Sequence, residues 1–110
     1  MAASHTITVE VALAPQQAEA AVYQAFLAAG LSWVVGGNGF MQGKVSAGMR
    51  SWGENVQATI GYGPRGAVVR LRSECALPTQ VIDWGKNRQN LERIVEVLRQ
   101  LAPLSSLSAP

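Results

Sequence analysis

The sequence predicts an α+β fold, a two-layer sandwich in which two helices cover one face of a curved five-stranded antiparallel sheet, in the order β-α-β-β-β-β-α. Three observations favour this fold. Several short segments alternate apolar and polar residues, as half-buried strands do. Two longer segments repeat apolar residues at helical spacing. Turn signals separate four consecutive strands, which must therefore form an antiparallel meander.

The chain is expected to begin with a strand and a helix. Residues 6–12 place Ile7 and Val9 on one side and threonine and glutamate on the other, which predicts a half-buried strand. Pro15 suits the first position of a helix, and Gly30 can end that helix in a left-handed conformation. The apolar side of this helix is rich in alanine, so we expect it to pack closely on the sheet.

The four central strands are predicted at residues 31–35, 40–47, 54–62 and 67–75. Gly36-Gly37-Asn38-Gly39 is a strong signal for the hairpin turn between the first two. A later turn, residues 61–66, reads G-x-G-x-x-G, but it precedes a strand and contains Pro64. A dinucleotide-binding loop of this pattern opens a helix, so we interpret the segment as a hairpin turn.

The second helix is predicted at the end of the chain, with Asp83 as its N-cap. Its apolar stripe consists of Trp84, Leu91, Ile94, Val95, Leu98 and Leu101. Pro103 cannot continue the helix and ends it. We therefore expect a single domain over residues 1–102, followed by a flexible C-terminal tail at residues 103–110.

The composition limits the classes of function. The chain has 110 residues, of which 48% are hydrophobic and 15% are charged, with a net charge of +2. So small a surplus makes a weak field, which disfavours a dedicated nucleic-acid binder. The sequence shows no signal-peptide pattern and no apolar run long enough to cross a membrane, so we expect a cytoplasmic protein. The single cysteine, Cys75, is expected to be a buried, inert thiol.

A tetrapeptide occurs twice with small changes, as Trp52-Gly53-Glu54-Asn55 and as Trp84-Gly85-Lys86-Asn87. One interpretation is a small-ligand pocket with two indole walls and with Glu54 and Lys86 as polar groups. The other is structural: each tryptophan anchors the start of an element, and Glu54 contacts Lys86. We favour the structural interpretation and keep Trp52, Glu54, Trp84 and Lys86 as candidate ligand-binding residues.

Two resemblances follow from these residues and from the element order. The strings "SWGEN" at residues 51–55 and "LPTQ" to "DWGKN" at residues 77–87 are similar to those of a group of small bacterial domains of unknown function, which implies no activity. The order β-α-β4-α resembles the TATA-binding-protein-like fold, and a small helix-grip, lipid-binding fold is the alternative. Members of the first fold wedge phenylalanines into DNA. Phe26 is committed to the helix face here, so minor-groove binding is not carried over.

The uncovered face of the predicted sheet is the candidate interaction face, and it carries Lys44, Gln57, Arg70 and Arg72. We expect this face to be polar and to lack the aromatic residues on which single-stranded nucleic acids stack. The favoured function is a non-enzymatic binding or interaction module that self-associates, with a homodimer as the expected state. The alternatives are a carrier of a small apolar ligand or lipid, held between the second helix and the sheet, and weak nucleic-acid binding.

Catalytic and metal-binding patterns are not recognisable in the sequence. His5 is the only histidine and precedes the first predicted strand, so it is a poor partner for a nucleophile. The acidic residues do not follow a spacing typical of zinc or calcium ligands. We therefore predict neither enzymatic activity, nor a metal site, nor a cofactor.

Overall fold

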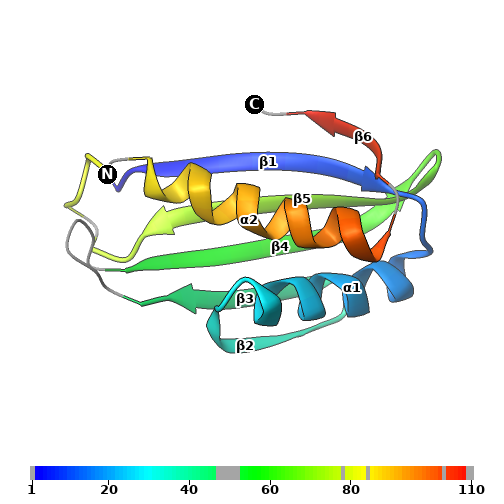
Figure 1. Cartoon of the computed structure of the whole chain (residues 1–110), viewed down its shortest axis with the longest axis horizontal. Helices are drawn as coiled ribbons and strands as arrows, with labels where there is room; N and C mark the ends of the chain where they lie inside the picture. Colours follow the sequence, from blue (N-terminus) through cyan, green and yellow to red (C-terminus); the bar gives the residue numbers. More distant parts are fainter. Residues whose placement is uncertain (1, 47–52, 78, 84, 103, 109–110) are drawn as a thin grey trace.

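The computed structural model describes residues 2–46, 53–77, 79–83, 85–102 and 104–108. The elements in chain order are β1 (Ser4–Val11), α1 (Pro15–Ala28), β2 (Ser32–Gly37), β3 (Phe40–Val45), β4 (Glu54–Gly63), β5 (Gly66–Cys75), α2 (Lys86–Leu101) and β6 (Leu104–Ser108). Both helices lie on the same face of one sheet, and the opposite face carries no helix (Figure 1). The predicted α+β sandwich is confirmed.

The sheet has six strands, in the order β2-β3-β4-β5-β1-β6, and all neighbouring strands are antiparallel. The predicted number of five is therefore one too low. The additional strand, β6, lies in the segment predicted to be a flexible tail, and it pairs with Thr8–Val11 of β1. β1 pairs with β5 on its other side, so its outer edge offers unpaired backbone groups to which the returning chain can bond.

The hydrophobic core fills the space between the helices and the sheet. Its largest fully buried apolar side chains come from both layers: Phe26, Leu71, Leu91, Ile94 and Leu98. The alternation predicted for β4 and β5 is observed, because every second side chain of these strands is buried over most of their length. α1 contributes small side chains, including Ala18 and Ala25, which let its backbone approach the sheet closely.

The start of α2 differs from the prediction that Asp83 is the N-cap. The helix begins at Lys86, and its N-cap is Gly85, in a left-handed conformation with φ 78°. The Asp83 side chain bonds to the N-cap residue rather than to the helix itself, since its Oδ1 accepts a hydrogen bond from the Gly85 N–H at 2.9 Å. The backbone N–H of Lys86 donates to the Asp83 carbonyl at 2.9 Å. Asp83 therefore fixes the turn that leads into the helix.

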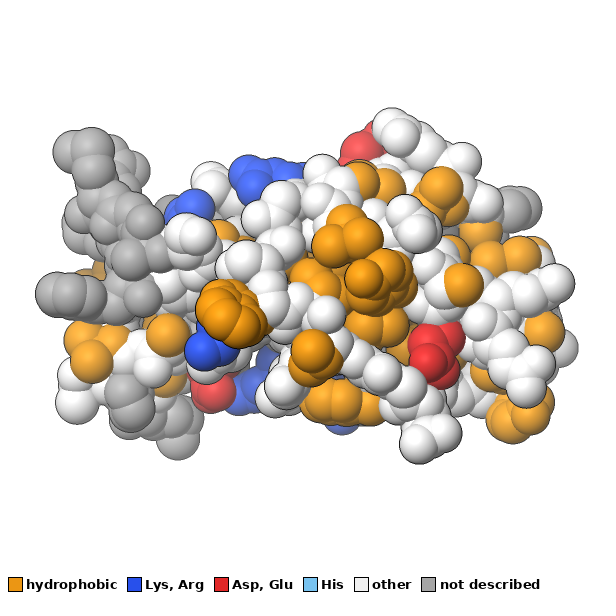
Figure 2. All heavy atoms as spheres, turned by 90° about the horizontal axis from the view of Figure 1, so that it is seen from below, with side chains coloured by type: hydrophobic (Ala, Val, Ile, Leu, Met, Phe, Trp, Pro, Cys, Tyr) orange, Lys and Arg blue, Asp and Glu red, His pale blue; other side chains and the backbone are white. Residues whose placement is uncertain are grey.

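The two edges of the sheet are β2 and β6. β2 lies on the same side of the molecule as α1, at the bottom of Figure 1. Figure 2 views the molecule from that side and shows hydrophobic side chains gathered near the middle of the surface. The large hydrophobic side chains exposed on α1 and β2 are Tyr23, Leu27, Trp33 and Val35. This edge of the sheet is thus open and apolar.

Candidate functional site: the open face of the sheet

The structure describes only part of the repeated tetrapeptides. Trp52 and Trp84 lie outside the described residues, so the predicted pocket with two indole walls stays a prediction. Glu54 is 1% exposed and begins β4, and its Oε1 accepts a hydrogen bond from Nδ2 of Asn90 at 2.7 Å. Lys86 is half-buried in the first turn of α2. The structure places Glu54 in contact with Asn90, and the Glu54–Lys86 contact stays a prediction.

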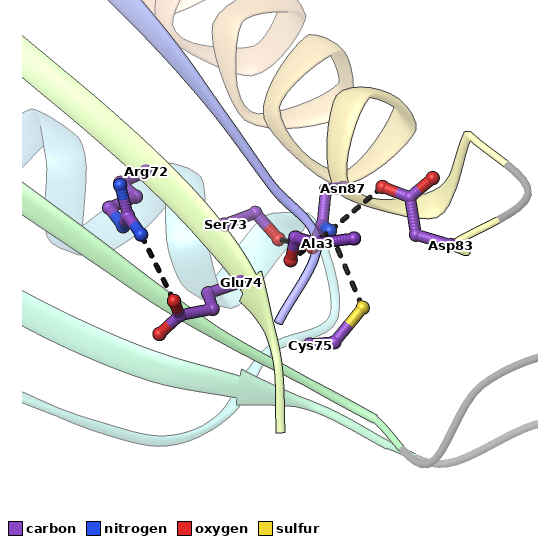
Figure 3. A network of polar contacts seen from close by, with 7 residues as sticks. All are labelled: Ala3, Arg72, Ser73, Glu74, Cys75, Asp83 and Asn87. Carbon is purple, nitrogen blue, oxygen red and sulfur yellow. Dashed lines mark hydrogen bonds and ion pairs between the residues drawn. The ribbon is translucent and has the colours of Figure 1, made fainter. Parts of the chain in front are cut away.

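Asn87 is the centre of a buried polar network that joins α2 to the sheet (Figure 3). Its Oδ1 accepts a hydrogen bond from Ser73 Oγ at 2.8 Å. Its Nδ2 lies 2.9 Å from the Ala3 carbonyl oxygen, 2.8 Å from Asp83 Oδ2 and 3.6 Å from Cys75 Sγ. Because its amide is occupied by neighbours within the fold, it is not available to a ligand. We assign Asn87 the role of holding the start of α2 against β5 and the N-terminal segment.

Asn90 extends the same network one turn further along α2. Its Nδ2 also lies 3.3 Å from Ser73 Oγ, whereas its Oδ1 is buried without a hydrogen-bond partner among the described residues. Asn90 and Ser73 are not among the candidate residues predicted from the sequence. A signal for Asn90 was present, because Asn87 and Asn90 share the helical face of the apolar residues Leu91 and Ile94. Polar residues on an apolar stripe indicate buried amides that need partners.

Cys75 lies at the edge of this network and is buried. Burial raises the pKa of its thiol, and the negative charges of Asp83, Glu54 and Glu74 act in the same direction. The hydrogen bond from Asn87 lowers the pKa and is the smaller effect. A thiol that is both buried and held protonated is a poor nucleophile, in accord with the inert cysteine predicted from the sequence.

The described part of the interface between α2 and the sheet is filled with side chains. Leu91, Ile94 and Leu98 point into it and are at most 1% exposed. A groove of about 510 Å³ does run beside α2, between the helix and β1, but its lining includes Arg88, Glu92, Glu96 and Arg99. Apolar ligands prefer pockets lined mainly by apolar side chains. The packing here gives no support to a carrier function.

The open face of the sheet brings the predicted interaction residues together. In the antiparallel register, Gln57 of β4 lies directly between Gln42 of β3 and Arg72 of β5. The neighbouring row toward one end contains Thr59 and Arg70, and the row toward the other end contains Lys44, Asn55 and Glu74. Lys44, Gln57, Arg70 and Arg72 therefore lie on one surface, as their alternation along the strands predicts.

Charges on this face are only partly paired. Arg72 forms an ion pair with Glu74, at 3.0 Å. Lys44 and Arg70 enter no ion pair within the described part of the chain. Glu10 of β1 is buried, and its Oε2 accepts a hydrogen bond from the backbone N–H of Arg65 at 2.9 Å. Its negative charge is thus used to hold the β4–β5 turn, and the accessible charge of the face is positive.

Trp33 is the unexpected residue of this face. The pairing of β2 with β3 shifts register between Ser32 and Val35, and Trp33 there has φ 55°. A bulky residue in the left-handed region is a genuine conformational outlier. The indole is nevertheless 80% exposed, so burial of the ring does not offset this conformation. In a regular strand the Trp33 side chain would lie on the helix-covered face of the sheet, like that of the buried Leu31. The bulge turns it to the open face instead.

A hollow of about 450 Å³ lies on the open face beside Trp33. Its lining is part polar and part apolar and comes from four neighbouring strands: Trp33, Val35, Gln42, Gly43, Lys44, Asn55, Val56, Gln57 and Glu74. Phe40, 38% exposed, stands on the same face by alternation, two residues from Gln42. The expectation that this face lacks aromatic residues is therefore wrong. An exposed ring, a cation and several amides around one hollow form a surface suited to binding a planar polar group.

Comparison with known proteins gives no assignment, because no family model, no curated protein and no solved structure matches this chain. The similarities to small bacterial domains and to the TATA-binding-protein-like fold stay predictions. Within the described ranges, neither helix is long and apolar enough to span a membrane.

Proposed function

We propose that this chain is a non-enzymatic binding module whose ligand surface is the open face of the sheet around Trp33. The observation that carries the proposal is the conformation of Trp33, which combines a left-handed backbone with an exposed indole beside the hollow. Backbone strain of this kind costs on the order of 1–3 kcal/mol and is concentrated at functional sites. An exposed, strained tryptophan adds little to the core, so its placement favours a role in recognition.

An amide chemical-shift titration tests this proposal. Oligonucleotides, oligosaccharides and peptides would each be added to the labelled protein, and a true ligand should shift amides of residues 33–44 and 55–59. The matched variant is Trp33→Asn, because asparagine tolerates the left-handed conformation and should preserve the bulge. This variant should lose the shifts while keeping the dispersion of the folded spectrum. A ligand that shifts only α1 and α2 would contradict the proposal.

Self-association is a second candidate function, and the open edge at β2 favours it. The β2 sequence, Ser-Trp-Val-Val-Gly-Gly, contains no charge and no proline, which are the usual devices that protect an edge strand. A hollow of about 630 Å³ lies between this strand and α1, beside Tyr23 and Val35. Two copies related by a two-fold axis could pair their β2 strands antiparallel, because such an interface needs only one self-complementary surface.

Light scattering after size-exclusion chromatography tests self-association. We expect the wild-type chain to have the mass of a dimer, and Val35→Lys to have the mass of a monomer because it places a charge beside the pairing edge. Leu77→Lys is the control, since it also replaces an exposed apolar residue but lies outside β2. A wild-type chain that stays monomeric at high concentration would exclude this mode.

A further inference from the structure

We infer that the open face binds single-stranded nucleic acid, with Trp33 and Phe40 as two stacking platforms. This inference rests on the proposed function and names its ligand class. Single-strand binders combine exposed aromatic rings with cations that follow the backbone, and base stacking tolerates any sequence. Both elements are on this face: two exposed aromatic residues at β2 and β3, and two cations, Lys44 and Arg70, that form no ion pair with any described residue.

The spacing of these groups fits an extended strand. Successive residues on one face of β3 are about 7 Å apart, so Phe40, Gln42 and Lys44 mark three rows over about 13 Å. The outer rows each hold a cation: Lys44 in one, and Arg70, two strands away from Phe40, in the other. The middle row carries the amides of Gln42 and Gln57, which can donate to and accept from base edges. Trp33 borders the hollow beside Lys44.

The charge distribution favours an anionic ligand over a second protein. Glu74 is neutralised by Arg72, and Glu10 is buried under the β4–β5 turn. These two carboxylates are thus engaged, whereas Lys44 and Arg70 form no ion pair among the residues that the structure describes. With so few cations, we expect weak binding and a shallow salt dependence. Two neutralised phosphates on a single strand correspond to a slope of about −1.4 in log K against log salt concentration.

Fluorescence anisotropy with a labelled single-stranded oligothymidine tests the inference. At low salt we expect saturable binding that is tighter than binding to a duplex of equal length, because only unpaired bases can stack on the rings of Trp33 and Phe40. Trp33→Asn should weaken binding at least about fivefold with an unchanged salt slope. Lys44→Gln should reduce the magnitude of the slope by about 0.7. Tyr62→Ala should bind as the wild type, because this equally exposed ring lies outside the hollow, at the β4–β5 turn.

Three outcomes would overturn the inference. They are undetectable binding at low salt, equal affinity of Trp33→Asn and the wild type, and equal affinity for duplex and single strand. The chemical-shift titration distinguishes a failure of the nucleic-acid inference from a failure of the proposed binding module. If another probe shifts the Trp33 face while the oligonucleotide does not, the inference is wrong and the binding module stands. If probes shift only the helices, both are wrong.

Discussion

At the scale of single residues, the hydroxyl of Ser73 links the buried side chains of two asparagines. Its Oγ donates to Asn87 and accepts from Asn90, and all three side chains are buried. Ser73→Ala leaves buried amide groups without this partner, which should lower the free energy of unfolding by about 1–3 kcal/mol. Urea denaturation measures the change. Ser46→Ala, at an exposed position, is the control and should stay within about 0.5 kcal/mol.

Equal losses of stability in the two serine variants would mean that the network contributes nothing to stability.

The sequence pointed to this region only indirectly. The repeated tetrapeptide contains Glu54 and Asn87 and favours a structural role over a ligand pocket, but it does not identify their hydrogen-bond partners. Which polar groups meet depends on the pairing of β4 with β5 and on the rotation of α2, neither of which a local motif encodes. The structure shows that hydrogen bonds within the fold occupy most of these groups.

Cys75 gives a prediction about pH. Its pKa in the folded chain is raised from the ordinary value of 9.0, chiefly by burial. Above pH 9.0 the unfolded chain releases the thiol proton while the folded chain retains it, so unfolding is favoured as the pH rises. The stability of the wild type should therefore fall more steeply above this pH than that of Cys75→Ala. Thermal melts from pH 7 to pH 10 measure both slopes.

The comparison with Cys75→Ala removes the contribution of other groups that titrate in the same range. The cavity left by the substitution lowers stability by an amount that does not vary with pH, so only the slopes are compared. The folded thiol should also react slowly with a disulfide reagent at neutral pH. Parallel slopes, together with rapid labelling of the native chain, would show that the thiol is accessible.

At the scale of elements, α2 offers a matched pair of leucines. Leu98 is 1% exposed in the core, whereas Leu101, on the predicted apolar stripe, is 50% exposed at the end of the helix. Leu98→Ala should lower the free energy of unfolding by about 2–5 kcal/mol, because it removes buried surface and leaves a cavity. Leu101→Ala should change it by less than about 1 kcal/mol. Chemical denaturation of both variants tests whether the helix packs as described.

The elements differ in how far the sequence predicts them. A short apolar run and a turn signal predict β2 and β3, and alternation predicts β1, β4 and β5, because β-branched residues on a half-buried surface leave a clear pattern. It could not locate β6, since Leu-Ser-Ser-Leu-Ser lacks β-branched and aromatic residues and pairs only because β1 has a free edge. It also could not place Trp33, because one bulge reverses the face of the residues around it.

At the scale of the whole molecule, β6 closes one edge of the sheet while β2 leaves the other open. The carbonyl of Ala3 accepts a hydrogen bond from the N–H of Cys75 in β5. Backbone groups alternate in direction along a strand, so the N–H of Val9 also points toward β5. The N–H groups of Thr8 and Glu10 point the other way, toward β6. If the chain is truncated after Ala102, the amides of Thr8 and Glu10 lose their partners. Both should then exchange hydrogen much faster, whereas the amide of Val9 stays protected.

Hydrogen-exchange NMR on the full and truncated chains measures these amides individually. Val9 is the internal control, because it shares the strand and the local stability of its neighbours and differs only in the direction of its N–H. Faster exchange at all three amides would mean that truncation loosens β1 as a whole. Unchanged protection of Thr8 and Glu10 would contradict the pairing of β6 with β1. The predicted alternation of fast and slow amides would instead show that β6 covers the edge of a sheet that the remaining strands already hold together.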